Sequence, residues 1–456
     1  HFPKKWKFSR VCPVFKSGSK NDVSNYRPIN LLNNFAKLFE GVIAKVIFSH
    51  VSGMIAQQQH GFVKGRSTVT NLCEFVQYVS NALDNKKQVD VIYTDLSKAF
   101  DRVDHCMLIN KLKQYGLCDN IIKLFCSLIR HRFQYVDYVG TRSQLYEVYS
   151  GVTQGSNLGP LLFLMFVNDI VKVLKCKLFL YADDLKIVKI ITNKNDCEYL
   201  QNNLDVFLLW CSNNYLKVNN KKCKIITFSI KSESIRYRYH INNVELERCM
   251  QLMDLGVVMD CTLSFVPHVN YVVNSAIKML GFITRNTSQF KNVNCLKLLY
   301  TSLVRSKLEY CCVVWSPFYN VHISDIERVQ RRFLKRLYFV KYGTYPQKQF
   351  PHEILLREFN ETTLCSRRNF CTVLFLYKLI HSTVDSAELL SQINFNVPKY
   401  GTRSSVTFTF NTPSTNQHMH SPLVNMVRLY NNVQQFVDIF VNVSEFIENA
   451  RTALLH

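Results

Sequence analysis

The order of apolar and polar residues along the chain predicts a mixture of strands and helices. Short apolar runs rich in β-formers predict strands, at 89–94, 135–139 and 224–228, with a strand pair and its turn inside 252–268. Apolar positions spaced three and four residues apart predict helices, at 33–50, 161–174 and 204–210, after Ser67 or Thr68, through Leu108 and Leu112, and over most of 270–340. The sequence therefore predicts both strands and helices before residue 270, and helices from 270 to about 340.

One predicted hairpin carries two adjacent carboxylates. Its flanks, 178–180 and 185–188, are short and rich in β-formers, so Tyr181-Ala182-Asp183-Asp184 falls at the turn. The plain explanation is that Asp is a common turn residue. Two neighbouring carboxylates repel each other, however, and a bound cation explains why a turn would keep both. The pair is therefore a candidate metal site.

A third carboxylate, Asp95, follows the strand predicted at 89–94. A carboxylate at a strand end that faces a carboxylate hairpin would make a cluster of three aspartates. Oxygen ligands of this kind suit Mg²⁺ or Mn²⁺. The sequence therefore predicts a site for a hard divalent cation.

The composition adds a class of partner. Among 456 residues, 56 Lys and Arg stand against 33 Asp and Glu, for a formal charge of +23. This balance favours a polyanion, either nucleic acid or an acidic membrane surface. Membrane insertion is not expected, because the longest apolar run, 161–167, is too short to span a bilayer. The 16 cysteines form no CxxC pairs, which favours free thiols in a reducing compartment.

Two loops carry further candidate ligand contacts. Lys16 and Arg27 stand on either side of a loop containing Gly18, where they could converge on phosphate. The alternative is two solvated surface cations. A Gly-rich turn at 151–160 opens a helix, and its glycines let the backbone come close to a bound base or sugar. The alternative is ordinary glycine punctuation before a helix.

A basic helix is predicted after Ser324, where Ser324 and Glu327 have the spacing of a capping box. Cations crowd the faces beside its apolar stripe, at Arg328, Arg331, Arg332, Lys335 and Arg336. They form either a solvated face or a surface that follows a nucleic-acid backbone, and the net charge favours the second. The region after 342 carries no motif that we interpret.

Taken in order, these segments resemble a known family. Asp95-Leu96-Ser97-Lys98-Ala99-Phe100-Asp101, Gly151-Val152-Thr153-Gln154-Gly155, Tyr181-Ala182-Asp183-Asp184 and Lys222 resemble motifs A to D of reverse transcriptases. Segments 14–16 with 25–29, and 61–62 with 65–68, are similar to the fingers blocks of non-LTR (LINE-type) retrotransposons. Segments 306–317 and 327–333 are similar to the jockey-like clade. Each block alone is weak, whereas six in order, up to about residue 340, are specific.

The resemblance implies an α+β fold of the right-hand polymerase type, with fingers, an antiparallel-sheet palm, a helical thumb and a mostly helical C-terminal region. It implies a division into 1–258 (fingers and palm), 259–345 (thumb-like) and 346–456 (unknown role). It also implies an RNA-directed DNA polymerase that extends a DNA 3′-OH on an RNA template with dNTPs, by target-primed reverse transcription. Such a protein would work in the nucleus and cytoplasm as a ribonucleoprotein, and would not be secreted.

The resemblance also implies roles for single residues. Asp95 and Asp183 would hold two Mg²⁺ (or Mn²⁺) ions, with Asp184 beside them. Lys16 and Arg27 would hold the triphosphate. Gln154 and Gly155 would back the nascent base pair, and Phe100 would be the steric gate beneath the sugar. Lys222 would protonate pyrophosphate. An exposed lysine between strands is an equally good explanation of Lys222.

The sequence departs from the family in several places. Thr153 stands where the family usually has Pro, and Asn157 replaces an aliphatic residue, both beside the substrate turn. We expect them to affect rate or fidelity more than activity. The chain begins with His1, which suggests a fragment, and the family's endonuclease and zinc knuckle are not found. Transposition would therefore need an endonuclease from outside this chain.

Two other functions stay open. A decayed or domesticated remnant would bind RNA without polymerising, but drift would have removed Asp95, Asp183 and Asp184 as readily as other residues. A viral RNA-templated polymerase is disfavoured, because Tyr-Ala precedes the paired aspartates.

Overall fold

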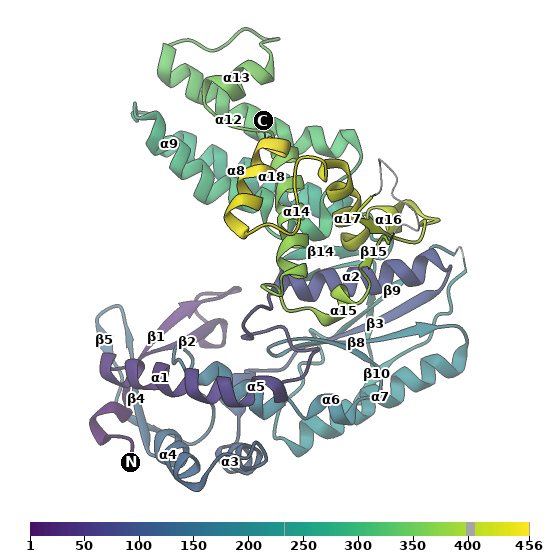
Figure 1. The fold of residues 1–456 in the computed structure, drawn as a ribbon. Coiled ribbons are helices and arrows are strands. Elements are labelled where there is room, and N and C mark those ends of the chain that lie inside the picture. Colours follow the sequence, from purple (N-terminus) through teal and green to yellow (C-terminus); the bar gives the residue numbers. More distant parts are fainter. Residues whose placement is uncertain (232, 398–405, 456) are drawn as a thin grey trace. The chain divides into compact units, whose positions relative to one another are not determined.

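The computed structural model describes residues 1–231, 233–397 and 406–455 (Figure 1). The chain divides into two compact units. The first unit comprises His1–Val63, Val91–Ile225 and Ile235–Arg248, and the second comprises Lys64–Asp90, Ile226–Ser234 and Cys249–His456. Helices and sheets occur together, so the α+β class is confirmed. The predicted division at 258 and 345 differs from these units and stays a prediction.

The first unit contains a mixed sheet with the order β2-β1-β4-β5, in which β6 also pairs with β4. Its strands are β1 (Phe8–Phe15), β2 (Tyr26–Leu31), β4 (Arg132–Tyr138), β5 (Thr141–Arg142) and β6 (Tyr146–Val148). Strand β1 runs antiparallel to β2, with Val14 opposite Arg27, and parallel to β4. Helix α1 (Asn34–Val51) follows, and the Asn33 side chain caps it by accepting the N–H of Phe35. The helix predicted at 33–50 and the strand predicted at 135–139 are confirmed.

A second sheet has the order β12-β9-β3-β8-β7, and Figure 1 shows β3 beside β8 and β9. Its strands are β3 (Gln88–Thr94), β7 (Lys177–Tyr181), β8 (Asp184–Ile191), β9 (Lys224–Phe228) and β12 (Glu247–Cys249). The unit borders fall inside β3, β9 and β12. Six of the seven residues of β3 are buried, as expected for a central strand. The strands predicted at 89–94 and 224–228 and the hairpin around Asp183 are confirmed.

Helices of the first unit enclose one hydrophobic core. Besides α1, they are α3 (His105–Lys113), α4 (Asp119–Ile129), α5 (Gly159–Val167), α6 (Ile170–Val173) and α7 (Lys194–Asn213). The single helix predicted at 161–174 is wrong, because Asn168 and Asp169 interrupt it. The Asn168 amide binds the backbone of Met54 and Ala56 at 2.8 Å each, and Asp169 pairs with Lys111. Helix α7 is longer than the predicted 204–210, because a capping box starts it at Asn193.

The second unit is mainly helical. Helix α2 (Thr68–Asp84) begins with a capping box made by Ser67 and Thr70, so the predicted cap is confirmed. The predicted strand pair is β13 (Gln251–Asp254) with β14 (Val257–Asp260). The longest helices are α8 (Val266–Asn286), α12 (Asn320–Tyr342), α14 (Leu364–Ile380), α17 (Pro422–Val433) and α18 (Val443–Leu455). Shorter helices include α9 (Val293–Tyr300), α10 (Ser306–Glu309), α11 (Cys312–Trp315), α13 (His352–Glu358), α15 (Ala387–Leu390) and α16 (Asn416–Met419).

The predicted start of the basic helix is wrong. Helix α12 begins at Asn320, so Ser324 and Glu327 lie inside it. The extended backbone of Tyr319, which follows Pro317 by two residues, sets the start instead. A Ser-x-x-Glu pattern therefore occurs here without forming a cap, and Glu327 instead accepts the N–H of Cys365 at 2.8 Å.

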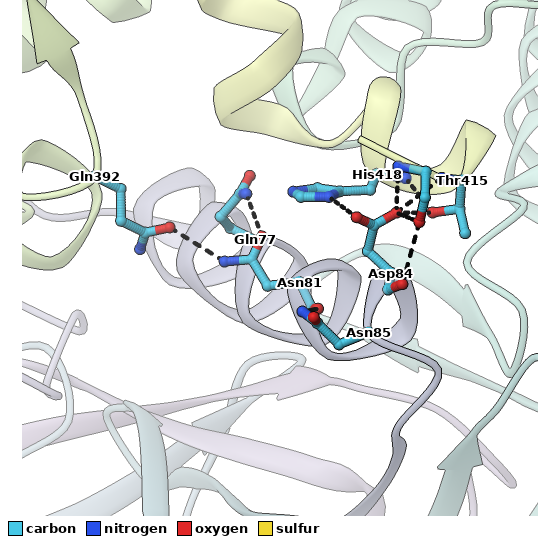
Figure 2. A network of polar contacts seen from close by, with 8 residues as sticks. Gln77, Asn81, Asp84, Asn85, Gln392, Thr415 and His418 are labelled. Atoms are coloured by element: carbon cyan, nitrogen blue, oxygen red, sulfur yellow. Dashed lines mark hydrogen bonds and ion pairs between the residues drawn. The ribbon is translucent and has the colours of Figure 1, made fainter. Parts of the chain in front are cut away.

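Figure 2 shows polar contacts between α2 and the later part of the second unit. The Asp84 carboxylate accepts hydrogen bonds from the N–H and hydroxyl groups of Ser414 and Thr415, at 2.8–2.9 Å. His418 Nδ1 lies 3.1 Å from its other oxygen. One carboxylate thus joins the end of α2 to the start of α16. We name Asp84, Ser414, Thr415 and His418 the Asp84 cluster.

Two expectations concern the surroundings of the chain. The sixteen cysteines, all of which lie in the described part of the chain, form no disulfide. In the part of the chain that the structure describes, helices long enough to cross a bilayer are not apolar enough to do so.

Candidate active site

A cavity of about 1160 Å³ in the first unit collects most of the predicted site residues. Its walls come from the β1–β2 hairpin, the segment after β3, the turn before α5 and the turn between β7 and β8. The predicted residues that line it are Lys16, Arg27, Asp95, Phe100, Gln154, Gly155, Asp183 and Lys222. Segments far apart in the sequence thus meet at one hollow.

The carboxylates of Asp95 and Asp183 both face this cavity. Burial raises the pKa of the Asp183 carboxyl, and the charge of Asp95 raises it further, whereas its own backbone N–H, Lys16 and Arg27 lower it. The net direction is upward, because burial and a neighbouring negative charge both disfavour the ionised carboxylate. A divalent cation between them would offset both burial and repulsion.

Asp184 does not join the other two aspartates. The turn consists of Ala182 and Asp183 alone, so Asp184 already belongs to β8, where it pairs with Tyr181. Asp184 is exposed and does not line the cavity. Among the described residues, no three His, Cys, Asp or Glu side chains gather as metal ligands. The structure therefore brings together two of the three aspartates in the predicted cluster.

Two cations stand on the β1–β2 hairpin. Arg27 lies opposite Val14 in the ladder, and the N–H of Lys16 donates to the carbonyl of Asn25 at 2.8 Å. Because residues two apart on a strand share a face, Lys16 and Arg27 project to the same side. Both are exposed, and within the described residues neither has an ion pair or hydrogen bond through its side chain. They are placed to receive an anion.

Asp95 is fixed from its backbone. Its N–H donates to the sulfur of Cys223 at 3.4 Å, and its carbonyl accepts the N–H of Asn219 at 2.8 Å. Lys222 lies on the same loop as Asn219, and its Nζ is 3.6 Å from the Asp95 carboxylate. The Lys222 side chain is 55% exposed, so this ion pair holds the two groups only loosely.

Phe100 lies between two other rings. It stacks on buried Phe163 at a centroid distance of 4.2 Å and meets Phe62 edge to face at 6.1 Å. Phe100 is half-buried, and it also lines the cavity. The packing interpretation and the gate interpretation therefore apply to the same ring, since Phe163 fixes the ring and the cavity exposes it.

Hydrogen bonds to other segments of the chain hold the turn before α5. The N–H of Asn30 donates to the carbonyl of Gln154 at 2.8 Å, and a Cβ on Gly155 would lie 2.6 Å from the Asn30 carbonyl oxygen. Only glycine fits that approach. The Gln154 amide donates to Asp101 at 2.8 Å. Asn157, which departs from the family pattern, donates to the carbonyl of Lys37 in α1 at 2.7 Å.

Sequence reasoning missed two residues of this site. Asp101 lines the cavity, and burial raises its pKa while Gln154 lowers it. Its place within the segment 95–101 was a signal that went unused. Gln59 is buried against the turn that carries Asp183, and nothing in its own neighbourhood of the sequence indicated this.

The basic face of α12 is partly occupied by internal contacts. Arg328 pairs with Asp325 at 3.0 Å, and Arg331 donates to the carbonyl of Phe350 at 2.8 Å. Arg332 is exposed and Lys335 is half-exposed, and within the described residues neither side chain has a partner. Arg336 donates to the carbonyl of Ser288 at 3.4 Å. Of the five predicted cations, Arg332 and Lys335 are thus the two available to a polyanion.

An α+β fold whose cavity brings together one carboxylate from a hairpin turn, one from the end of a neighbouring strand and two cations is the arrangement of the polymerase class. The profile of the family described as "Reverse transcriptase (RNA-dependent DNA polymerase)" matches residues 18–284. The chain therefore belongs to the reverse transcriptase family, as its motifs predict.

Individual relatives are transposon proteins of Drosophila melanogaster. The probable RNA-directed DNA polymerase from transposon BS is 27% identical over 360 residues, which cover 74% of this chain and 39% of that protein. The RNA-directed DNA polymerase from mobile element jockey is 26% identical, with 74% and 38% covered. The chain spans about two fifths of the length of these curated relatives. Among solved structures, apo telomerase from Candida tropicalis matches with a TM-score of 0.44 and 11% identity, covering 86% of this chain and 69% of that chain.

Proposed function

We propose that this chain is the polymerase part of a non-LTR retrotransposon reverse transcriptase, and that it extends a DNA 3′-OH on an RNA template. The observation that carries the proposal is the single cavity that gathers Asp95, Asp183, Lys16 and Arg27. Two carboxylates and two cations that have no side-chain partner among the described residues suit a triphosphate with its divalent cations. The relatives' printed activities support the same function.

Asp95 and Asp183 would hold two Mg²⁺ or Mn²⁺ ions, whereas the third predicted ligand, Asp184, lies on β8 outside the cavity. The fit rests on the donor set, because both cavity carboxylates offer hard oxygen ligands and the Asp183 carboxyl lacks a side-chain hydrogen-bond donor among the described residues. When bound, the ions supply the charge that activates the primer 3′-OH and neutralises the triphosphate.

The chain's own groups orient the reactants. Lys16 and Arg27 would bind the phosphates, with Arg as a planar donor and Lys as a point charge. Phe100 would lie beneath the sugar, and the backbone at Gly155 would approach the nascent base pair. Lys222 forms an ion pair with Asp95 at 3.6 Å. It would donate a proton to pyrophosphate as a general acid.

Primer extension tests this function. Wild-type chain, a DNA primer annealed to RNA, dNTPs and Mg²⁺ should give elongated products, and Asp95→Asn should remove them. The matched control is Asp119→Asn, at the start of α4, which should extend primers at the wild-type rate. Absence of extension by the wild-type chain on RNA and DNA templates, with template binding retained, would favour the alternative of a remnant that only binds RNA.

We further propose that Arg328, Arg331, Arg332 and Lys335 of α12 contribute to nucleic-acid binding, chiefly through Arg332 and Lys335. The net charge of +23 supports this. A ribonucleoprotein of this kind would be found in the nucleus and cytoplasm, which imaging of a tagged chain would test.

A further inference from the structure

A buried glutamine binds the turn that carries Asp183. Gln59 is 3% exposed. Its Oε1 accepts the N–H of Ala182 at 2.8 Å and the N–H of Gly61 at 2.8 Å, and its Nε2 lies 3.4 Å from the Ala182 carbonyl. One side-chain amide therefore contacts both polar groups of the residue that precedes Asp183.

Ala182 needs such a partner because its backbone is strained. Its φ is +57°, in the left-handed region that costs a residue with a side chain about 1–2 kcal/mol. A strained residue at a functional site persists only where its surroundings fix it. The alternative conformation, with negative φ, would turn the peptide that leads into Asp183 and move its carboxylate.

The backbone around Gln59 fits the same turn. The carbonyl of Gln58 accepts the N–H of Leu180 at 3.0 Å, and the N–H of His60 donates to the Leu180 carbonyl at 2.9 Å, so the segment adds a short parallel bridge to β7. A Cβ on Gly61 would lie 2.3 Å from the nitrogen of Ala182. The close approach thus requires a glycine at 61 as well as an acceptor at 59.

The same segment also reaches Phe100. Phe62, next to Gly61, meets the Phe100 ring edge to face. At its other end, the segment is anchored where Asn168 binds the backbone of Ala56. Residues 56–62 therefore connect Asn168, which follows α5, with two parts of the cavity lining: the turn that carries Asp183, and Phe100.

We propose that Gln59 is a positioning residue for Asp183: its amide holds Ala182 in the left-handed conformation, so that the Asp183 carboxylate faces Asp95. This inference rests on the proposed function for its kinetic consequence, but the hydrogen bonds of Gln59 do not depend on activity. Gln59 does not line the cavity, so it acts through the backbone of the turn rather than on the substrate.

The test compares three variants. Gln59→Leu keeps the size of the side chain but leaves two buried N–H groups without an acceptor. Gln59→Glu keeps the acceptor oxygen. The matched control is Gln77→Leu in α2 of the second unit. Gln77 is a buried glutamine whose amide donates to Asn81 (Figure 2) and accepts the N–H of Leu423.

In primer extension, we expect Gln59→Leu to lower kcat by roughly tenfold to a hundredfold, as displacements of about 1 Å do in active sites. The KM for dNTP should stay within about twofold, because Lys16 and Arg27 are untouched. Gln59→Glu should recover most of kcat, and Gln77→Leu should lower the melting temperature while keeping kcat.

Hydrogen–deuterium exchange gives a readout that is independent of activity. A peptide covering 181–184 should exchange at least about tenfold faster in Gln59→Leu, whereas peptides from α7 should stay as in wild type, which shows that the unit is folded. If no variant and no wild-type chain extends primers but this exchange difference is present, the proposed function fails and the positioning role of Gln59 stands. Wild-type exchange and kcat in Gln59→Leu, or an equal loss in Gln59→Glu, would overturn the proposal.

Discussion

Two aspartates of this chain show how differently a fold can treat the same side chain. For Asp84, burial raises the pKa, but hydrogen bonds from His418, Thr415 and Ser414 lower it more, so that the net pKa lies well below the usual range. For Asp183, burial raises the pKa and the hydrogen bond that opposes it comes from its own backbone N–H. The Asp84 carboxylate thus accepts hydrogen bonds from several other residues, whereas the Asp183 carboxylate accepts none from another side chain among the described residues.

This difference separates groups that hold the fold together from groups that await a ligand. A charged group with protein partners favours the folded state, whereas a buried charged group without partners costs stability unless a ligand binds it. Like Asp183, four cations have no side-chain partner among the described residues: Lys16 and Arg27 in the first unit, and Arg332 and Lys335 in the second. Arg328 and Arg331 fall with Asp84, because Asp325 and the Phe350 carbonyl bind them.

The largest expected effect comes from Asp183→Asn. The amide keeps the shape but removes the charge, so extension on RNA and DNA templates should fall by about a hundredfold or more, as it does when other electrostatic interactions with a transition state are removed. Because the repulsion between Asp183 and Asp95 is relieved, the melting temperature should be equal to or higher than that of wild type. Rates are measured by single-nucleotide incorporation and stability by calorimetry. A large drop in melting temperature would contradict the comparison, since Asp183 would then be structural.

The opposite result is expected for Asp84→Asn. Removal of a charged acceptor with several donors should destabilise the second unit by about 1–3 kcal/mol, with the incorporation rate of folded protein unchanged. The folded-state pKa lies below the unfolded value of 3.8, so this stabilisation is complete above about pH 5 and is lost as the pH falls through the folded pKa.

Melting temperatures between pH 3 and pH 7 test this sign. The gap between wild type and Asp84→Asn should be constant from pH 5 to pH 7 and should narrow below pH 4. The exposed-surface control, Asp119→Asn, should show no gap. A gap that widens on acidification would contradict the assignment of this pH dependence to Asp84.

The sequence predicted those parts of the site whose cause is local. The turn at 181–184 follows from β-formers on both flanks, and the cap at Ser67 follows from its own hydroxyl. The hydrogen bonds of Gln59 are different, because its partner Ala182 is 123 residues away. No local pattern encodes such a long-range pairing.

The wrong predictions have the same physical origin. The pattern at 324–327 satisfies the spacing of a cap, yet α12 already begins at Asn320, and Glu327 accepts the N–H of Cys365 on another helix instead of the N–H of Ser324. The apolar run at 161–174 has a helical period, yet Asn168 ends α5 by binding the backbone near residue 55. In each case a long-range hydrogen bond outweighed a local preference of a few tenths of a kcal/mol to about 1 kcal/mol.

Phe100 both packs in the protein, on Phe163, and lines the ligand cavity. The variant Phe100→Val separates these two roles. Loss of the stack on Phe163 should lower stability by up to a few kcal/mol, which is the structural share. The ligand share is selectivity: the ratio of kcat/KM for rNTP to that for dNTP should rise by about tenfold or more, because a 2′-OH no longer meets the ring. Phe207→Leu, a buried ring of α7 in the same unit, is the control and should change stability alone. An unchanged ratio in Phe100→Val would leave Phe100 a packing residue.

The smallest effect is expected on α12, where the comparison predicts a difference between two pairs of cations. Arg332 and Lys335 have no partner among the described residues, so each is available to a phosphate, and removing one such cation should reduce the slope of log K against log salt by about 0.7–0.9. The double variant Arg332→Ala/Lys335→Ala should therefore flatten the slope by roughly twice that amount, whereas Arg328→Ala/Arg331→Ala should change it by less than half as much. Binding of an RNA–DNA duplex over a salt series, measured by fluorescence anisotropy, distinguishes the two. Equal slopes for both double variants would show that internal partners do not decide which cations bind nucleic acid, and a slope unchanged in both would make this face merely solvated.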